Sequence, residues 1–195
     1  MSKSALSVLA TFLVCAGAHS SRAGEDGQVR PVSALEFGVL GGFEPVHGDL
    51  PENAAALLGA DLRIRIAVVS LGVRYERTAG FSGPGGVEGF TRVLGTLGFN
   101  IGLGRRTSLS PYFGVGSTHV EYLSPRSLDV GPFYGGPPDQ LTGRFGLEFE
   151  QFLSTSLSLG GGVAFDVRSY GGDGMQGSAA LSAIGRLGFH MPFEK

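Results

Sequence analysis

Apolar and polar residues alternate with a period of two through most of the chain after residue 31. In the segment 140–152, the apolar Phe145 and Leu147 have odd residue numbers, whereas the charged Arg144 and Glu148 have even ones. This odd or even position along a strand is here called the parity of a residue. Successive side chains of a β-strand point to opposite faces, so this alternation predicts strands with one apolar and one polar face. A comparable repeat at the helical spacing of three and four is not found.

The alternation divides the chain into eight predicted strands. They cover residues 32–43, 56–66, 69–78, 90–103, 108–122, 140–152, 155–169 and 177–193. One segment departs from the pattern: Glu52–Leu58 (ENAAALL) is compatible with a short helix in a loop. An even number of strands joined in sequence predicts an all-β, up-and-down antiparallel barrel.

The links between the predicted strands are alternately long and short. The long ones are 44–55, 79–89, 123–139 and, of moderate length, 171–176; the short ones lie at Ala67-Val68, Gly104–Thr107 and Leu153-Ser154. In an up-and-down sheet all long links then fall at one end. Bacterial outer-membrane barrels have this asymmetry, with short periplasmic turns and longer extracellular loops.

Arginines and carboxylates dominate the polar face, and only one lysine, Lys195, follows residue 23. A soluble barrel usually carries Lys and Glu on an outer polar face. The interior of an eight-stranded barrel is just wide enough for side chains to fill, and the planar guanidinium suits enclosed pairing. We therefore expect the apolar face to meet lipid and a polar network to plug the lumen. Its predicted members are Glu36, Arg63, Arg65, Arg74, Glu76, Arg92, Arg144, Glu148, Asp166, Arg168 and Arg186.

Aromatic residues cluster near both ends of the predicted strands, as in the belts that mark the two water–lipid interfaces. Those near the long links are Phe43, Tyr75, Phe90, Tyr122 and Tyr170, and those near the short turns are Phe99, Phe149, Phe152 and Phe193.

The composition agrees with a barrel in lipid. Gly accounts for 34 of the 195 residues, and charged residues for 16%, against about 25% in ordinary soluble domains. The net charge of −2 gives no reason to expect a nucleic-acid partner. Apolar stretches of about 18 residues, which would predict a transmembrane helix, do not occur.

Residues 1–23 have the features of a secretory signal peptide. Lys3 supplies the positive start, an apolar run follows, and Ser21-Arg22-Ala23 places small residues around a cleavage site after Ala23. A second possible cut follows Ser20. We expect a short lead at 24–31 and the barrel domain at 32–195, without the single cysteine, Cys15.

The last predicted strand contains Arg186, Gly188, Met191 and Phe193 at the spacing polar, Gly, hydrophobic, aromatic. This resembles the C-terminal assembly signal of outer-membrane proteins, and the whole chain is similar in architecture to the OmpA-like and OmpW-like outer-membrane β-barrels. The resemblance implies the cell outer membrane of a Gram-negative bacterium, contact with its lipid and lipopolysaccharide, and the barrel-assembly machinery as a partner in biogenesis. Pro192 departs from the pattern because it lacks a backbone donor.

Residues suited to metal or phosphate binding do not form a known motif. His47, His119 and His190 lack paired ligand spacing. Gly83–Gly86 is Gly-rich, but neither a Lys-Ser/Thr pair nor a predicted helix follows it. We therefore predict neither a metal nor a cofactor.

One set of residues has the components of nucleophilic catalysis. Ser117, His119 and Glu121 alternate along one predicted strand and therefore share a face. Neighbours on one face lie about 6.6–7 Å apart at Cα, so a direct contact needs cooperative rotamers. The alternative interpretation is a polar stripe in the lumen near the long links.

The leading hypothesis is a non-enzymatic barrel with a structural or surface-interaction role. The link 123–139, with Phe133 and Tyr134, is a candidate contact surface. Three alternatives remain open: a narrow conduit for small or hydrophobic solutes, a lipid-A- or phospholipid-modifying enzyme, and a soluble periplasmic barrel that carries an apolar ligand.

Overall fold

The computed structural model describes residues 30–45, 54–79, 87–122, 139–169 and 177–193. The signal segment, the candidate loop 123–138, His47, Gly83–Gly86 and Tyr170 lie outside the described residues, as do the side chains of Glu121 and Tyr122. The strands are β1 (Ser33–Pro45), β2 (Ala54–Ile66), β3 (Val69–Ala79), β4 (Val87–Phe99), β5 (Ile101–Gly102), β6 (Thr107–Tyr122), β7 (Asp139–Phe152), β8 (Leu157–Ser169) and β9 (Gly177–Pro192).

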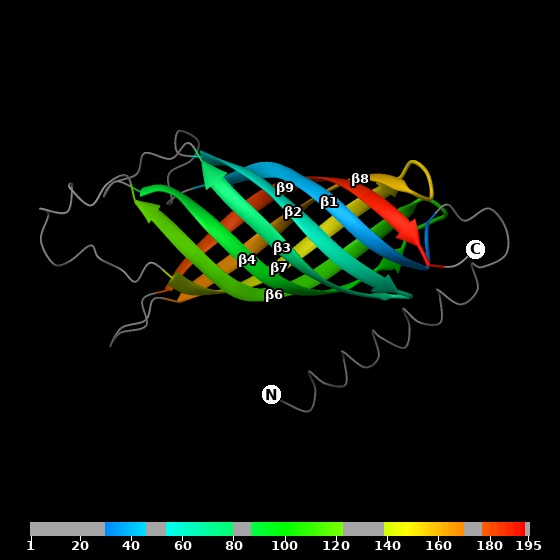
Figure 1. Cartoon of the computed structure of the whole chain (residues 1–195), viewed down its shortest axis with the longest axis horizontal. Coiled ribbons are helices and arrows are strands. Elements are labelled where there is room, and N and C mark those ends of the chain that lie inside the picture. Colours follow the sequence, from blue (N-terminus) through cyan, green and yellow to red (C-terminus); the bar gives the residue numbers. More distant parts are fainter. Residues whose placement is uncertain (1–29, 46–53, 80–86, 123–138, 170–176, 194–195) are drawn as a thin grey trace, which may run out of the picture.

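The strands close into one antiparallel barrel (Figure 1). Their order is β4-β3-β2-β1-β9-β8-β7-β6-β5, and β4 also pairs with β6. The two-residue β5 follows β4 after Asn100 and pairs with the start of β6. Because β4 also pairs with β6, β4 and β5 together form one of the eight strands of the barrel. The prediction of an all-β, up-and-down antiparallel barrel is therefore confirmed.

Three short turns connect strands at one rim, here called the turn rim. They comprise residues 67–68, 103–106 and 153–156. Ala67 has φ of 52°, the left-handed conformation that a two-residue hairpin turn requires. Because the strands alternate in direction, β1 begins and β9 ends at this same rim. The opposite rim, here called the loop rim, carries the strand ends to which the predicted long links attach.

The predicted helix at Glu52–Leu58 is wrong where the structure describes it, because β2 begins at Ala54. Ala55 and Leu57 are buried, whereas Ala56 and Leu58 are exposed, so the period-two pattern continues to this end of the strand. Pairing with β1, which runs to Pro45, outweighs the helix preference of three consecutive alanines.

Apolar side chains cover the outside of the barrel and charged ones fill its inside. Phe145 is 64% exposed and Phe165 45%, whereas the adjacent Arg144 and Asp166 are fully buried. Such a continuous apolar outer surface is unfavourable in water and suits contact with lipid. It is the reverse of a soluble ligand-carrying barrel, whose apolar residues point inward. Among the described residues, helices long and apolar enough to span a membrane are absent.

Two members of the expected aromatic belts lie inside instead. Phe152 is fully buried, and the guanidinium of Arg168 lies 4.9 Å from the centre of the Phe90 ring. Both residues have the parity of lumen-facing neighbours: Arg92 follows Phe90 by two positions, and Glu150 precedes Phe152 by two. Phe43, Tyr75, Phe149 and Phe193 are exposed on the outer face, in agreement with belts.

Candidate functional site

The most elaborate polar arrangement of the molecule is an ion-pair network in the lumen. All eleven residues predicted for it are buried there, together with three further carboxylates. The described part of the lumen thus holds seven buried guanidiniums and seven buried carboxylates. The arginines are Arg63, Arg65, Arg74, Arg92, Arg144, Arg168 and Arg186, and the acids are Glu36, Glu44, Asp61, Glu76, Glu148, Glu150 and Asp166.

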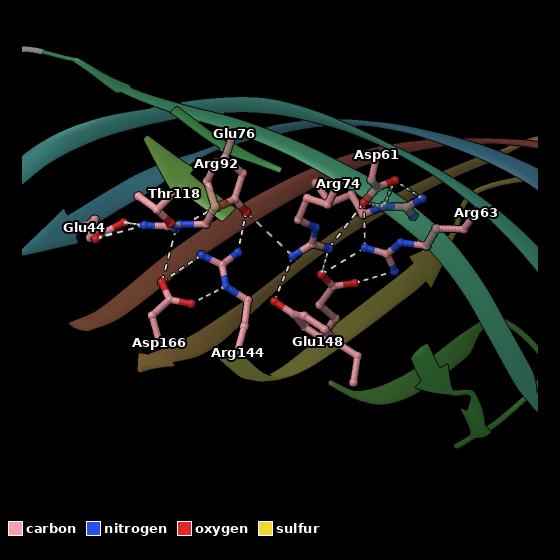
Figure 2. A network of polar contacts seen from close by, with 12 residues as sticks. Glu44, Asp61, Arg63, Arg74, Glu76, Arg92, Thr118, Arg144, Glu148 and Asp166 are labelled. Atoms are coloured by element: carbon pink, nitrogen blue, oxygen red, sulfur yellow. Dashed lines mark hydrogen bonds and ion pairs between the residues drawn. The ribbon is translucent and has the colours of Figure 1, made fainter. Parts of the chain in front are cut away.

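A first group of these residues, the loop-side cluster, is centred on Arg92 (Figure 2). Arg92 lies 2.9 Å from both Glu44 and Glu76, and 3.1 Å from Asp166. Its Nε donates to the hydroxyl of Thr118. Arg144 from β7 donates to both oxygens of Asp166, at 2.6 and 2.9 Å. The Arg92 guanidinium thereby connects five strands: β4, on which it lies, and β1, β3, β6 and β8.

A second group, the turn-side cluster, connects β2, β3, β7 and β9. Arg63 donates to both oxygens of Glu148, at 2.7 and 3.1 Å, and to Asp61 at 2.6 Å. Arg74 also pairs with Glu148. Arg186 lies 3.0 Å from Asp61 and 2.7 Å from Glu150. Bidentate pairing of this kind fixes side-chain geometry as well as charge.

Glu76 joins the two clusters (Figure 2). One of its oxygens, Oε1, lies 2.5 Å from Nη1 of Arg144 and 3.9 Å from Nη1 of Arg74. The Arg74 guanidinium also donates to the hydroxyl of Tyr112 at 2.8 Å. The network therefore runs without interruption along the lumen, from Glu44 on the loop side to Glu150 on the turn side.

Glycines make room for the large lumen side chains. The ring of Tyr112 lies against Gly146, where an added Cβ would overlap the ring. Gly38 and Gly188 are opposite each other on β1 and β9, and an added Cβ at either would stand 2.6 Å from a nitrogen of Arg186. Glycine at these positions thus leaves room for the close approach of Tyr112 and Arg186.

The lumen also contains an apolar component that the alternation did not reveal. Leu40, Tyr112, Ala164 and Ile184 are buried in mutual contact. They have the parity of the buried polar residues on their strands, so the lumen is filled by both polar and apolar side chains. This mixture is expected for a small barrel whose interior must be packed.

Three acidic lumen residues and one histidine are missing from the set predicted from the sequence: Glu44, Asp61, Glu150 and His190. Glu44 was placed in the link 44–55, although it shares the parity of Glu36 and Leu40 on β1. Asp61, Glu150 and His190 alternate visibly with apolar neighbours, so their parity alone would have included them. His190 lies 2.7 Å from the hydroxyl of Ser158 and 3.3 Å from Glu36.

Ser117 and His119 lie on the outer face of β6, both exposed, while Thr118 between them is buried in the lumen. The alternative interpretation as a lumen stripe is therefore wrong. Thr118 shares the inward parity of Tyr112 on β6, so the odd-numbered Ser117 and His119 face outward. The side chain of Glu121 lies outside the described residues, so the structure does not bring the three candidates together.

The predicted C-terminal signal has residues on both faces of β9. Arg186 and Gly188 point into the lumen, whereas Met191 and Phe193 are exposed outside. Within the described part of the chain, a cluster of three or more His, Cys, Asp or Glu residues suited to a metal ion is absent.

Comparisons with known proteins identify the fold alone. Neither a family model nor a curated protein sequence matches the chain. The N-terminal β-barrel domain of Pseudomonas aeruginosa OprF has a TM-score of 0.55 at 12% identity, covering 81% of this chain and 97% of that one. Neisserial surface protein A (NspA) has a TM-score of 0.52 at 10% identity, covering 83% and 97%. The chain thus has the fold of the eight-stranded outer-membrane β-barrels, with an ion-pair network in its lumen.

Proposed function

We propose that this protein is an integral outer-membrane barrel whose lumen does not conduct, and that it acts as a rigid membrane anchor for its loop rim. The observation that carries the proposal is the unbroken ion-pair network between Glu44 and Glu150. Its export by the N-terminal signal segment and its insertion by the barrel-assembly machinery are parts of the same proposal.

The network argues against an open channel because it occupies the cross-section at two levels. Arg92 reaches Glu44, Glu76 and Asp166 on three other strands, and Arg63 with Arg74 reaches Glu148 across the lumen. Eight strands leave an interior that such side chains fill. Removing one partner of a buried ion pair costs about 3–5 kcal/mol, so an arrangement that leaves these charges unpaired is strongly disfavoured.

A narrow water-filled path is the second candidate, and one observation favours it. Side-chain oxygens of Ser108, Gln140 and Ser182 are buried without a hydrogen-bond partner among the described residues. Buried polar atoms of this kind commonly bind ordered water. A chain of such sites would need to bypass both clusters in order to conduct ions.

Planar-bilayer recording of the purified full-length protein separates the two candidates. We expect the wild type to show no steady conductance. The double variant Glu76→Ala/Arg144→Ala, which removes the junction of the clusters, is expected to show discrete openings. The matched control Arg105→Ala/Arg106→Ala changes two exposed residues of a turn and should stay silent. Steady conductance of the wild type would overturn the proposal in favour of the conduit.

A lipid-modifying enzyme receives less support. Ser117 and His119 are next-but-one neighbours on the lipid-facing side of β6, at the spacing that discourages direct contact.

A further inference from the structure

The outer face of the barrel is apolar along most of its described strands. Among outward-facing strand side chains that the structure describes, Arg77 and His119 are the only basic ones, and acidic ones are absent. With Thr91 and Ser117 they form what is here called the rim patch, on the adjacent strands β3, β4 and β6. Each of Arg77, Thr91 and His119 already has a polar interaction within the protein.

Strand register brings these residues together. Arg77 is the cross-strand partner of Thr91, and Thr91 is the partner of His119. Neighbouring strands lie about 4.7–4.9 Å apart, so the three backbones span about 10 Å.

The rim patch lies at the loop rim. Arg77 is two residues before the end of β3, and His119 three before the end of β6. Near the same rim, the outward residues of other strands are exposed and apolar: Phe43 on β1, Leu141 on β7 and Val167 on β8. The patch is therefore a local feature of three strands and not part of a ring around the barrel.

The depth of the patch explains how a charge is tolerated there. An arginine on the lipid face costs about 2–4 kcal/mol at the bilayer midplane but only about 0–1 kcal/mol near the interface. In the proposed location, with the loop rim at the cell surface, residue 77 is level with the headgroups of the outer leaflet. A guanidinium binds phosphate in a bidentate manner, and the adjacent Thr91 hydroxyl is a further donor.

We propose that the rim patch binds a phosphate group of lipopolysaccharide, held chiefly between Arg77 and Thr91. The inference rests on the proposed outer-membrane location. It assigns a lipid-binding role to a surface that the lumen network does not involve.

Native mass spectrometry of the folded full-length protein in detergent tests this proposal. Diphosphorylated lipid A, lipid A without phosphates and phosphatidylglycerol are offered separately. We expect retention of diphosphorylated lipid A, at least about tenfold weaker retention in Arg77→Gln, and unchanged retention in the control Arg105→Gln at the turn rim. Heat-modifiable gel mobility confirms that each variant is folded.

Three outcomes would overturn the proposal. In the first, Arg77→Gln retains diphosphorylated lipid A as strongly as the wild type does. In the second, the wild type retains lipid A without phosphates as strongly as diphosphorylated lipid A. In the third, it retains phosphatidylglycerol as strongly as diphosphorylated lipid A, which would remove the assignment to lipopolysaccharide. Failure of the proposed function would be detected by the planar-bilayer recording instead. A conducting wild type contradicts the plugged lumen but leaves the lipid-binding measurements unaffected.

Discussion

Glu76 and Arg144 are 68 positions apart in the chain, yet the Arg144 guanidinium donates to the Glu76 carboxylate at 2.5 Å inside the barrel. Arg144 holds Asp166 with its other nitrogens. This one guanidinium therefore connects β3, β7 and β8. Closing the barrel is what brings the three groups together.

Replacing Arg144 by Met is expected to destabilise the barrel by about 3–5 kcal/mol, because Glu76 and Asp166 then lose a buried partner. Urea unfolding in lipid vesicles measures the change. The matched variant Arg105→Met alters an exposed arginine of a turn and should change the free energy of unfolding by less than about 0.5 kcal/mol. Equal midpoints for the two variants would show that the network adds little to stability.

Gly146→Ala is expected to destabilise the barrel by about 1–3 kcal/mol, because its methyl group would overlap the ring of Tyr112. Gly143→Ala on the same strand is the control, since its methyl group would meet only a carbonyl oxygen, at 4.0 Å. The two unfolding midpoints are compared under identical conditions. Indistinguishable midpoints would contradict the close packing of Tyr112 on Gly146.

Phe145→Arg tests the outward orientation of the apolar face. Phe145 lies midway along β7 and is exposed, so an arginine there is expected to cost about 2–4 kcal/mol in a bilayer. Phe193→Arg, beyond the end of β9 at the turn rim, should cost about 0–1 kcal/mol. The free energies of unfolding in vesicles provide the comparison. A larger loss at Phe193 would argue against a membrane position centred on the barrel.

His119→Ala tests the enzymatic alternative. We expect the phospholipid and lipid A species of cells producing this variant to match those of cells producing the wild type, by mass spectrometry of extracted lipids. Cells lacking the protein are the reference. A lipid species present only with the wild type would instead identify a covalent modification that depends on His119.

The alternation along each strand was sufficient to predict the fold and most of the lumen. Arg63, Arg65 and Arg74 could be assigned inward because parity fixes which face each side chain occupies. Phe90 and Phe152 were misassigned because the aromatic-belt pattern was given more weight than their parity. Glu44 was missed because the end of β1 lies two residues beyond its predicted boundary at residue 43.

The sequence by itself determined the strands, the faces and the direction in which the apolar side points. Only the tertiary structure decided which guanidinium meets which carboxylate, and that Thr91 lies between Arg77 and His119. Parity is a property of neighbouring residues, whereas these pairings depend on register between strands and on closure of β4 against β6. Those relationships join residues far apart in the chain, so local pattern does not encode them.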